Sequence, residues 1–235
     1  MSRRPGGELA SRPLHFIWIC DCSGSMQSDG KIQSLNNAIK EAIPHMQSAA
    51  DENPNAQVFV RAIKFSDGAQ WHIPDATPVA DFRWADLKAE GMTDMGKAVS
   101  MVAEQLRIPP MSERALPPIL ILVSDGQPTD DFSGAVRDLL SLPWGKRAVR
   151  IAVAIGEDAD QDALRQFVAN PELPVLRADN SETLVNYIKW ASTAVLKAAS
   201  APASQHHQAA GASAAAGNVP VPTPPSASVS SSEVW

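Results

Sequence analysis

The sequence has little of what marks secreted proteins. Only two of its 235 residues are cysteines. These are Cys20 and Cys22, and a disulfide between them would close a strained ring, so we expect free thiols in a reducing compartment. A metal-binding pair is the alternative, although the chain has no second cysteine pair to complete such a site. Residues 1–13 are arginine-rich and lack the apolar core of a secretory signal, which favours a cytoplasmic location.

Long apolar runs and blocks of basic residues are also missing. No stretch approaches the ~18 apolar residues of a membrane helix. The net charge is −6 and the calculated pI is 5.3, whereas a nucleic-acid-binding surface usually needs a basic patch. We therefore expect neither a membrane partner nor a nucleic-acid partner.

A short apolar run followed by oxygen-bearing side chains stands near the N-terminus. Residues 14–20 are rich in aromatic and β-branched side chains and predict a strand buried on both faces. Asp21, Ser23 and Ser25 follow at once, with Gly24 allowing a tight turn. Such a strand ends at the carboxyl edge of its sheet, where open α/β sheets bind ligands. Carboxylate and hydroxyl oxygens suit Mg²⁺ or Mn²⁺, and not zinc or copper.

Two later segments offer more oxygen donors. Thr93 stands at the start of a helical pattern, and Asp125 stands at the exit of the most apolar run in the chain. An octahedral ion takes six ligands, so the first loop needs donors from elsewhere in the chain, from water or from a bound partner.

Together, these three segments resemble the metal-ion-dependent adhesion site of a von Willebrand factor A domain. The family pattern is D-x-S-x-S, then a separate Thr, then a separate Asp, and the resemblance covers roughly residues 14 to 197. It implies five metal ligands, which are Asp21, Ser23, Ser25, Thr93 and Asp125. One coordination position is left open for an Asp or Glu of a protein partner, so that the Mg²⁺ or Mn²⁺ ion joins two acidic groups that would otherwise repel. The second loop reads Gly91-Met92-Thr93, where many relatives have Gly-Gly-Thr.

Other residues near these segments have more than one interpretation. Asp94, Asp130 and Asp131 are expected to cap helices or to support the site from outside it. Four glycines should provide backbone freedom at the rim, namely Gly24, Gly91, Gly96 and Gly126. Three methionines, Met26, Met92 and Met95, form either an apolar rim that adapts to partners or part of the ordinary core.

Strands alternate with helices along the chain, and the strongest strands are continuous apolar runs. This predicts an α/β, Rossmann-like, doubly wound sheet that is mostly parallel, with helices on both faces and one antiparallel edge strand. The expected strands are 14–20, 57–65, 69–73, 119–123, 148–155 and 174–177. The expected helices are 31–50, 97–106, 132–142, 161–168 and 181–198.

The composition divides the chain into three parts. Residues 1–13 are expected to be a flexible N-terminus, and residues 14–198 form the domain. Residues 199–235 are dominated by Ala, Ser, Pro, Gly and His, so they should bury too little surface to offset the entropy of ordering and form a disordered tail.

Three functions are compatible with these patterns. The first is a metal-dependent module that binds an acidic side chain of a partner protein. The second is a metal-dependent hydrolase or phosphatase centred on Asp21, but no phosphate loop is present and no His or Lys stands near the site in sequence as a general base. The third is a structural domain with a purely structural metal. We favour the first and do not expect an enzyme.

Residues 122–131 narrow the resemblance further. The run Leu-Val-Ser-Asp-Gly-Gln-Pro-Thr-Asp-Asp resembles intracellular bacterial members of the tellurium-resistance type. That resemblance implies a stress or metal-resistance role beside kinase and phosphatase partners.

Overall fold

The computed structural model describes residues 11–53, 55–201 and 219–226. Its centre is a six-stranded sheet in the order β3-β2-β1-β4-β5-β6. All neighbouring strands are parallel except the β2–β3 pair, so β3 is the antiparallel edge strand that the sequence predicts. The strands are β1 (Arg12–Asp21), β2 (Ala56–Ser66), β3 (Gly68–Pro78), β4 (Ile119–Ser124), β5 (Val149–Ile155) and β6 (Leu176–Ala178).

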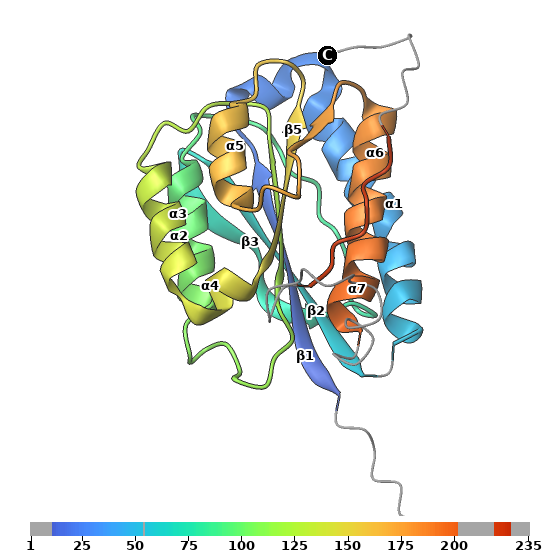
Figure 1. Ribbon diagram of the computed structural model, residues 1–235. Helices are drawn as coiled ribbons and strands as arrows, with labels where there is room; N and C mark the ends of the chain where they lie inside the picture. The colour runs from blue at the N-terminus through green and yellow to red at the C-terminus, as the bar shows by residue number, and fades with distance from the viewer. Residues whose placement is uncertain (1–10, 54, 202–218, 227–235) are drawn as a thin grey trace, which may run out of the picture.

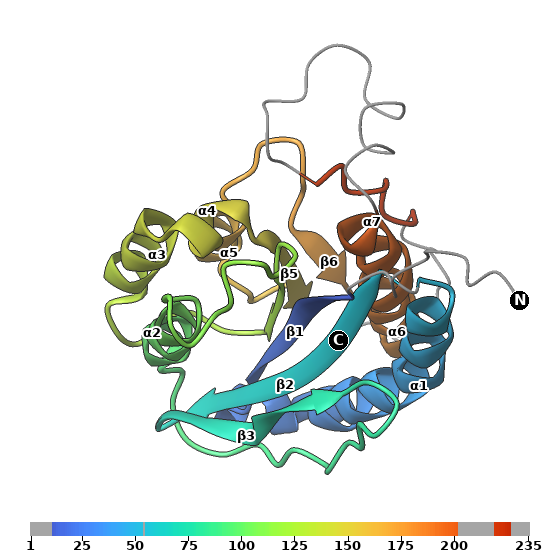
Figure 2. The same cartoon turned by 90° about the horizontal axis from the view of Figure 1, so that it is seen from below.

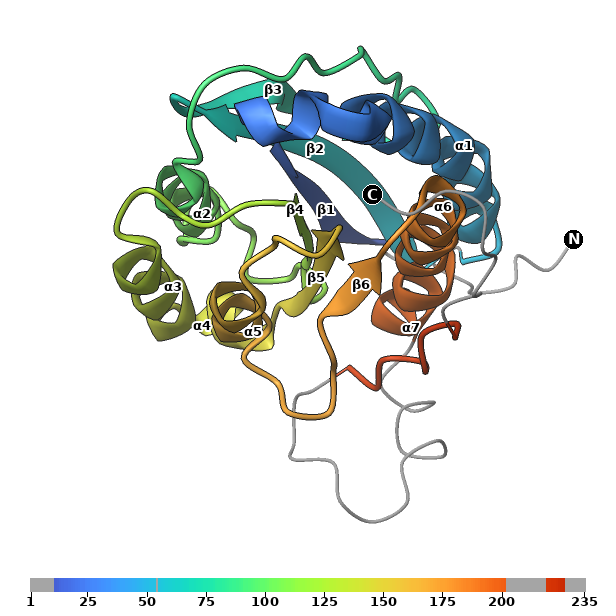
Figure 3. The same cartoon turned by 90° about the horizontal axis from the view of Figure 1, so that it is seen from above.

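Helices cover both faces of this sheet. The helical elements are η1 (Gly24–Gly30), α1 (Lys31–Asp51), α2 (Met95–Gln105), α3 (Phe132–Ser141), α4 (Pro143–Arg147), α5 (Gln161–Val168), α6 (Ser181–Trp190), η2 (Ala191–Val195) and α7 (Leu196–Ser200). Seen from above, α1, α6 and α7 lie on one face and α2, α3 and α5 on the other (Figure 3). The predicted doubly wound α/β fold is therefore confirmed.

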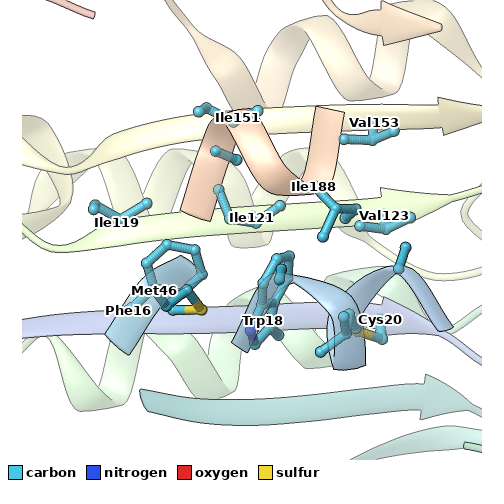
Figure 4. Close-up of a cluster of buried hydrophobic side chains, with 14 of the residues drawn as sticks. Phe16, Trp18, Cys20, Met46, Ile119, Ile121, Val123, Ile151, Val153 and Ile188 are labelled. Carbon is cyan, nitrogen blue, oxygen red and sulfur yellow. The ribbon is translucent and has the colours of Figure 1, made fainter. Parts of the chain in front are cut away.

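The central strands bury side chains on both faces. Phe16, Trp18 and Cys20 of β1 belong to the apolar cluster beneath α1 and α6, together with residues of β4 and β5 (Figure 4). The alternate residues Ile17 and Ile19 belong to the second cluster, beneath α2 and α3. Because successive strand residues point to opposite faces, one continuous apolar run supplies both cores. The two-sided burial fixes the register of β1 and therefore the place where Asp21 leaves the sheet.

Several elements differ from those expected. The chain between β1 and α1 forms η1, and a short helix, α4, follows α3. Strand β3 extends to Pro78, well beyond the expected end at residue 73. Helix α1, in contrast, agrees with the expected helix 31–50 to within one residue and includes Pro44. The two cysteines are free, as predicted, and both are buried.

The C-terminal region contains one segment that the structure describes. Residues 219–226 lie beside α7 (Figures 1 and 2), and Val219 and Val221 pack, half-buried, against the cluster beneath α1 and α6. This segment differs from the expectation of a disordered tail, because its two valines supply apolar side chains that pack against the core. The rest of the expected tail, residues 202–218 and 227–235, and residues 1–10 of the N-terminus, lie outside the described residues. Within the described ranges, no helix is long and apolar enough to cross a bilayer.

Candidate functional site

Two of the site segments leave the sheet side by side. Strands β1 and β4 are parallel neighbours with Cys20 opposite Val123, so Asp21 and Ser124 end the two strands at the same level. From β1 the chain order runs to β2 and β3 on one side and to β4, β5 and β6 on the other. The loops after β1 and β4 therefore flank the point where the winding of the sheet reverses, which is where such sheets bind ligands.

Asp21 is a buried carboxylate held by the ends of both strands. Its side chain is fully buried. The Ser23 backbone N–H donates to Oδ1 at 2.7 Å, and the Ser124 hydroxyl donates to Oδ2. These bonds fix the orientation of the carboxylate but bring no positive charge to it.

A chain of hydrogen bonds joins the first loop to Asp125. The Ser25 hydroxyl donates to Asp125 Oδ1 at 2.7 Å, and the Ser23 and Ser25 hydroxyl oxygens are 3.0 Å apart. Since the Ser25 proton points to Asp125, Ser23 is the donor in the serine pair. Asp125 Oδ2 accepts a bond from Lys31 Nζ at 2.9 Å, in a pair whose carboxylate is fully buried. The side chains of Ser23, Ser25, Asp125 and Lys31 thus form one connected hydrogen-bond network.

Thr93 reaches the same place from the second loop. A methyl group on Gly126 would lie 3.5 Å from Thr93 Oγ1 and 3.9 Å from Asp21 Oδ2, so the hydroxyl and the carboxylate share one small space. Within the described chain the Thr93 hydroxyl makes no hydrogen bond, although Thr93 is 8% exposed. The five predicted ligands are therefore brought together.

Backbone bonds tie the second loop to the first. The Glu90 N–H donates to Cys22 O at 2.7 Å, and the Gly24 N–H donates to Gly91 O at 2.9 Å. Gly91 has φ +80°, and a Cβ there would lie 2.6 Å from Asp67 Oδ2. Only glycine fits this close approach. The Gly-Met-Thr sequence thus retains the glycine that the geometry requires.

The neighbouring aspartates cap and brace the loops. Asp130 accepts the N–H groups of Gly96 and Lys97 at the start of α2, at 2.7 and 2.8 Å. Asp131 accepts the Gly134 N–H at the start of α3. Asp94 accepts the Gly68 N–H at 2.8 Å and pairs with Lys97. These contacts agree with the supporting role expected for the three residues.

The methionines divide between the two interpretations. Met26 and Met95 are fully buried, so they belong to the core. Met92 is 58% exposed and directly precedes Thr93, so it alone matches the expected rim.

Lys31 is not among the residues predicted for the site, and the expectation that no lysine stands near the site in sequence is wrong. Asp29 and Gly30 both have positive φ, at 54° and 69°, which turns the chain so that α1 begins with Lys31 directed back at Asp125. A signal was available in the spacing. Lys31 lies one turn before Leu35, on the buried face of α1, which is apolar apart from Lys31 and Asn36.

Burial raises the pKa of Asp21 to about 6, from an ordinary value of 3.8. Desolvation is the main cause, and the bonds from Ser124 and Ser23 offset it in part, while the nearby Asp125 charge adds to the increase. The site therefore buries two carboxylates with a single ammonium group beside them. A second cation at this place would stabilise the charged form of Asp21.

The donor set fits a hard divalent ion. It consists of two carboxylates and three hydroxyls, all oxygens, which suit Mg²⁺ or Mn²⁺. No cluster of three or more His, Cys, Asp or Glu side chains of metal-binding geometry occurs in the described residues, so the hydroxyls are needed to complete the set.

Comparison with known proteins agrees with this geometry. The model of the von Willebrand factor type A domain family matches residues 17–190, which include all five predicted ligands. The chain belongs to this family. No curated protein sequence matches it.

Solved structures share the fold of this von Willebrand factor A domain at low identity. A von Willebrand factor type A protein from Catenulispora acidiphila is 20% identical with a TM-score of 0.60, over 80% of this chain and 43% of that one. The ArnB paralog VWA2 from Sulfolobus acidocaldarius is 20% identical with a TM-score of 0.58, over 76% and 45%. Proximal thread matrix protein 1 from the mussel byssus, with a zinc-occupied MIDAS motif, is 17% identical with a TM-score of 0.57, over 79% and 47%. The chain spans less than half of each of these proteins.

Proposed function

We propose that this domain binds a divalent cation, Mg²⁺ or Mn²⁺, and through it captures an Asp or Glu side chain of a protein partner. The observation that carries the proposal is the meeting of Asp21, Ser23, Ser25, Thr93 and Asp125 at the reversal point of the sheet, with the charge of Asp21 buried and without a cationic partner. Membership of a family that commonly mediates metal-dependent protein contacts supports it.

Each group has a role in this proposal. Asp21 and Asp125 would supply the negative charge, and the three hydroxyls would supply neutral oxygen donors. Two carboxylates leave a divalent ion with no excess of negative charge around it, so a third carboxylate from a partner remains attractive. The exposed Met92 beside Thr93 offers an apolar contact to the residues that flank the partner's acidic group.

The experiment uses Mn²⁺ and its effect on the relaxation of water protons. Bound Mn²⁺ that retains exchangeable water enhances the relaxation, and a carboxylate that takes the open position lowers it. We expect saturable enhancement with the wild type and none with Asp21→Ala. A glutamate-containing peptide should lower the enhancement, whereas the same peptide with glutamine should not. Absence of Mn²⁺ binding by the wild type would contradict the proposal.

The finer expectations stay predictions. None of the similar structures described above is named as a tellurium-resistance protein, so kinase and phosphatase partners and a bacterial stress role rest on the sequence resemblance alone. A cytoplasmic location and the absence of enzymatic activity are likewise proposals. No contact in the described chain favours the alternative hydrolase, because both oxygens of Asp21 accept bonds from Ser23 and Ser124 and none comes from a histidine.

A further inference from the structure

Lys31 is a buried lysine at the start of α1. Only 9% of its side chain is exposed, which is unusual for a residue type that is almost never fully buried unless paired. The charge is placed there by the left-handed turn at Asp29 and Gly30, which separates η1 from α1. Since η1 begins inside the first metal-type loop, Lys31 belongs to the same continuous stretch as Ser23 and Ser25.

The contact that Lys31 makes is with a predicted metal ligand. Its Nζ lies 2.9 Å from Asp125 Oδ2, while Ser25 occupies Oδ1 of the same carboxylate. Both oxygens of Asp125 are therefore engaged by donors from the chain. A divalent ion at this carboxylate competes with Lys31 for Oδ2, and it brings a second positive charge next to the ammonium group.

The two predicted carboxylate ligands differ because of this lysine. Asp125 forms an ion pair with Lys31, whereas Asp21 has no ion-pair partner and accepts hydrogen bonds from uncharged donors only. Breaking a buried ion pair is costly because it leaves a charge without compensation, so the Lys31–Asp125 pair is not a neutral neighbour of the site.

We propose that Lys31 is an internal competitor for the cation: its ammonium group holds Asp125 and gives up that contact when a divalent ion binds. The inference rests on the proposed function and deepens it, because it names the residue that sets the affinity for the ion. Cation binding then requires a change of the Lys31 side chain at the start of α1, the long helix that packs against α6.

The first test is a Mn²⁺ titration by calorimetry on the wild type, Lys31→Met and Lys40→Met. Methionine has a similar length and no charge. Lys40 is a matched control on the same helix, in an exposed pair with Asp86. We expect Lys31→Met to bind Mn²⁺ at least about tenfold more tightly and Lys40→Met to be unchanged. Unchanged or weaker binding by Lys31→Met would overturn the inference.

The second test uses only the wild type, so it does not depend on the variant folding. Reductive methylation followed by peptide mass mapping reports the access to each lysine. Without a cation, Lys31 should be protected relative to Lys40, and saturating Mn²⁺ should make Lys31 reactive while Lys40 is unaffected. Protection of Lys31 that persists at saturation would show that the ammonium group stays on Asp125, which contradicts displacement.

The outcomes separate this inference from the proposed function. If the wild type and Lys31→Met both bind no Mn²⁺, the proposed function fails and this inference fails with it. If the wild type binds Mn²⁺ with Lys31 still protected, only the inference about Lys31 fails.

Discussion

At the amino edge of the sheet, Arg150 buries a positive charge at the start of β5; at the carboxyl edge, Asp21 and Asp125 bury negative charges after β1 and β4. Arg150 donates to the carbonyl oxygens of Phe167, Val168, Gly145 and Ala148. The guanidinium thus binds the carbonyl groups at the C-terminal end of α5, where the helix dipole favours a cation. Its hydrogen bonds are satisfied without a carboxylate. Burial still lowers its pKa to about 10.

At the carboxyl edge, the buried charges are not all compensated by groups of the fold. Of the two buried carboxylates, only Asp125 is paired with an ammonium group, whereas Asp21 has only uncharged donors. A buried charge whose partners are all supplied by the fold indicates a structural role, whereas one that lacks a partner indicates a place for a ligand. A cavity of about 200 Å³ lies beside Arg150 and is also lined by Lys146 and Arg147.

The largest effect on stability is expected from removing the fully hydrogen-bonded charge of Arg150. Arg150→Met leaves four buried carbonyl groups without their donor, so it should lower the free energy of unfolding by roughly 3–5 kcal/mol. Urea denaturation in Mg²⁺ and in EDTA should give the same loss. Arg165→Met is the control, because Arg165 pairs with Asp162 at the surface and should cost under about 1 kcal/mol. A loss at Arg150 that depends on the cation would contradict the contrast between the two edges.

A smaller effect of opposite sign is expected at Asp21. Its pKa is raised from 3.8 to about 6 in the folded state, so folding favours the protonated form. In EDTA, that favourable term is fully present below pH ~4 and is lost as the pH rises through about 6. Asp21→Asn has no such loss, so its free energy of unfolding at pH 7.5 should exceed that of the wild type by up to roughly 3 kcal/mol.

Urea denaturation of both proteins in EDTA between pH 4 and 8 measures this difference. The two should be similar at pH 4 and diverge by pH 7. Parallel pH dependences would show that the charge of Asp21 is compensated within the fold.

A third prediction concerns the second loop. Gly91→Ala combines a φ of +80° with a Cβ only 2.6 Å from Asp67, so it should cost about 2 kcal/mol and weaken Mn²⁺ binding by shifting Thr93. Gly68→Ala is the matched control. Gly68 has φ +92° but nothing within 4 Å, so it should pay backbone strain alone and bind Mn²⁺ normally. Calorimetry and thermal melts on both variants separate the two effects, and equal Mn²⁺ affinities would contradict the role of Gly91.

The smallest effect on stability is expected at the rim. Met92→Ala should change the free energy of unfolding by less than about 0.5 kcal/mol, because the side chain is 58% exposed. Met95→Ala, in the core, should cost about 2–5 kcal/mol. Met92→Ala should nevertheless weaken the Glu-peptide effect on Mn²⁺-enhanced relaxation. A full peptide response in this variant would remove Met92 from the contact surface.

The comparison also shows what sequence reasoning can reach. Continuous apolar runs such as residues 119–123 indicate their own secondary structure and two-sided burial, and the oxygen donors that follow them must lie at one edge of the sheet. Thr93 is predicted from its place at the start of a helical pattern and from the order of the family motif. Arg150 and Lys31 are not predicted. The helical spacing places Lys31 on the buried face of α1, but it does not identify Asp125, 94 positions away, as the partner. Arg150 depends on carbonyl groups at the end of α5. The segment at residues 219–226 was missed for a related reason, since its composition alone does not show that a partly apolar surface lies beside α7.

The most direct test of the central claim is a thermal melt in excess Mg²⁺, in Mn²⁺ and in EDTA, for the wild type and Asp21→Ala. A ligand at a hundredfold over its Kd stabilises by about 2.7 kcal/mol, which corresponds to roughly 5–10 °C for a domain of this size. We expect this increase in Tm for the wild type and none for Asp21→Ala. A wild-type Tm that is the same with either cation as in EDTA would contradict the proposal that the unpaired carboxylate of Asp21 belongs to a cation site.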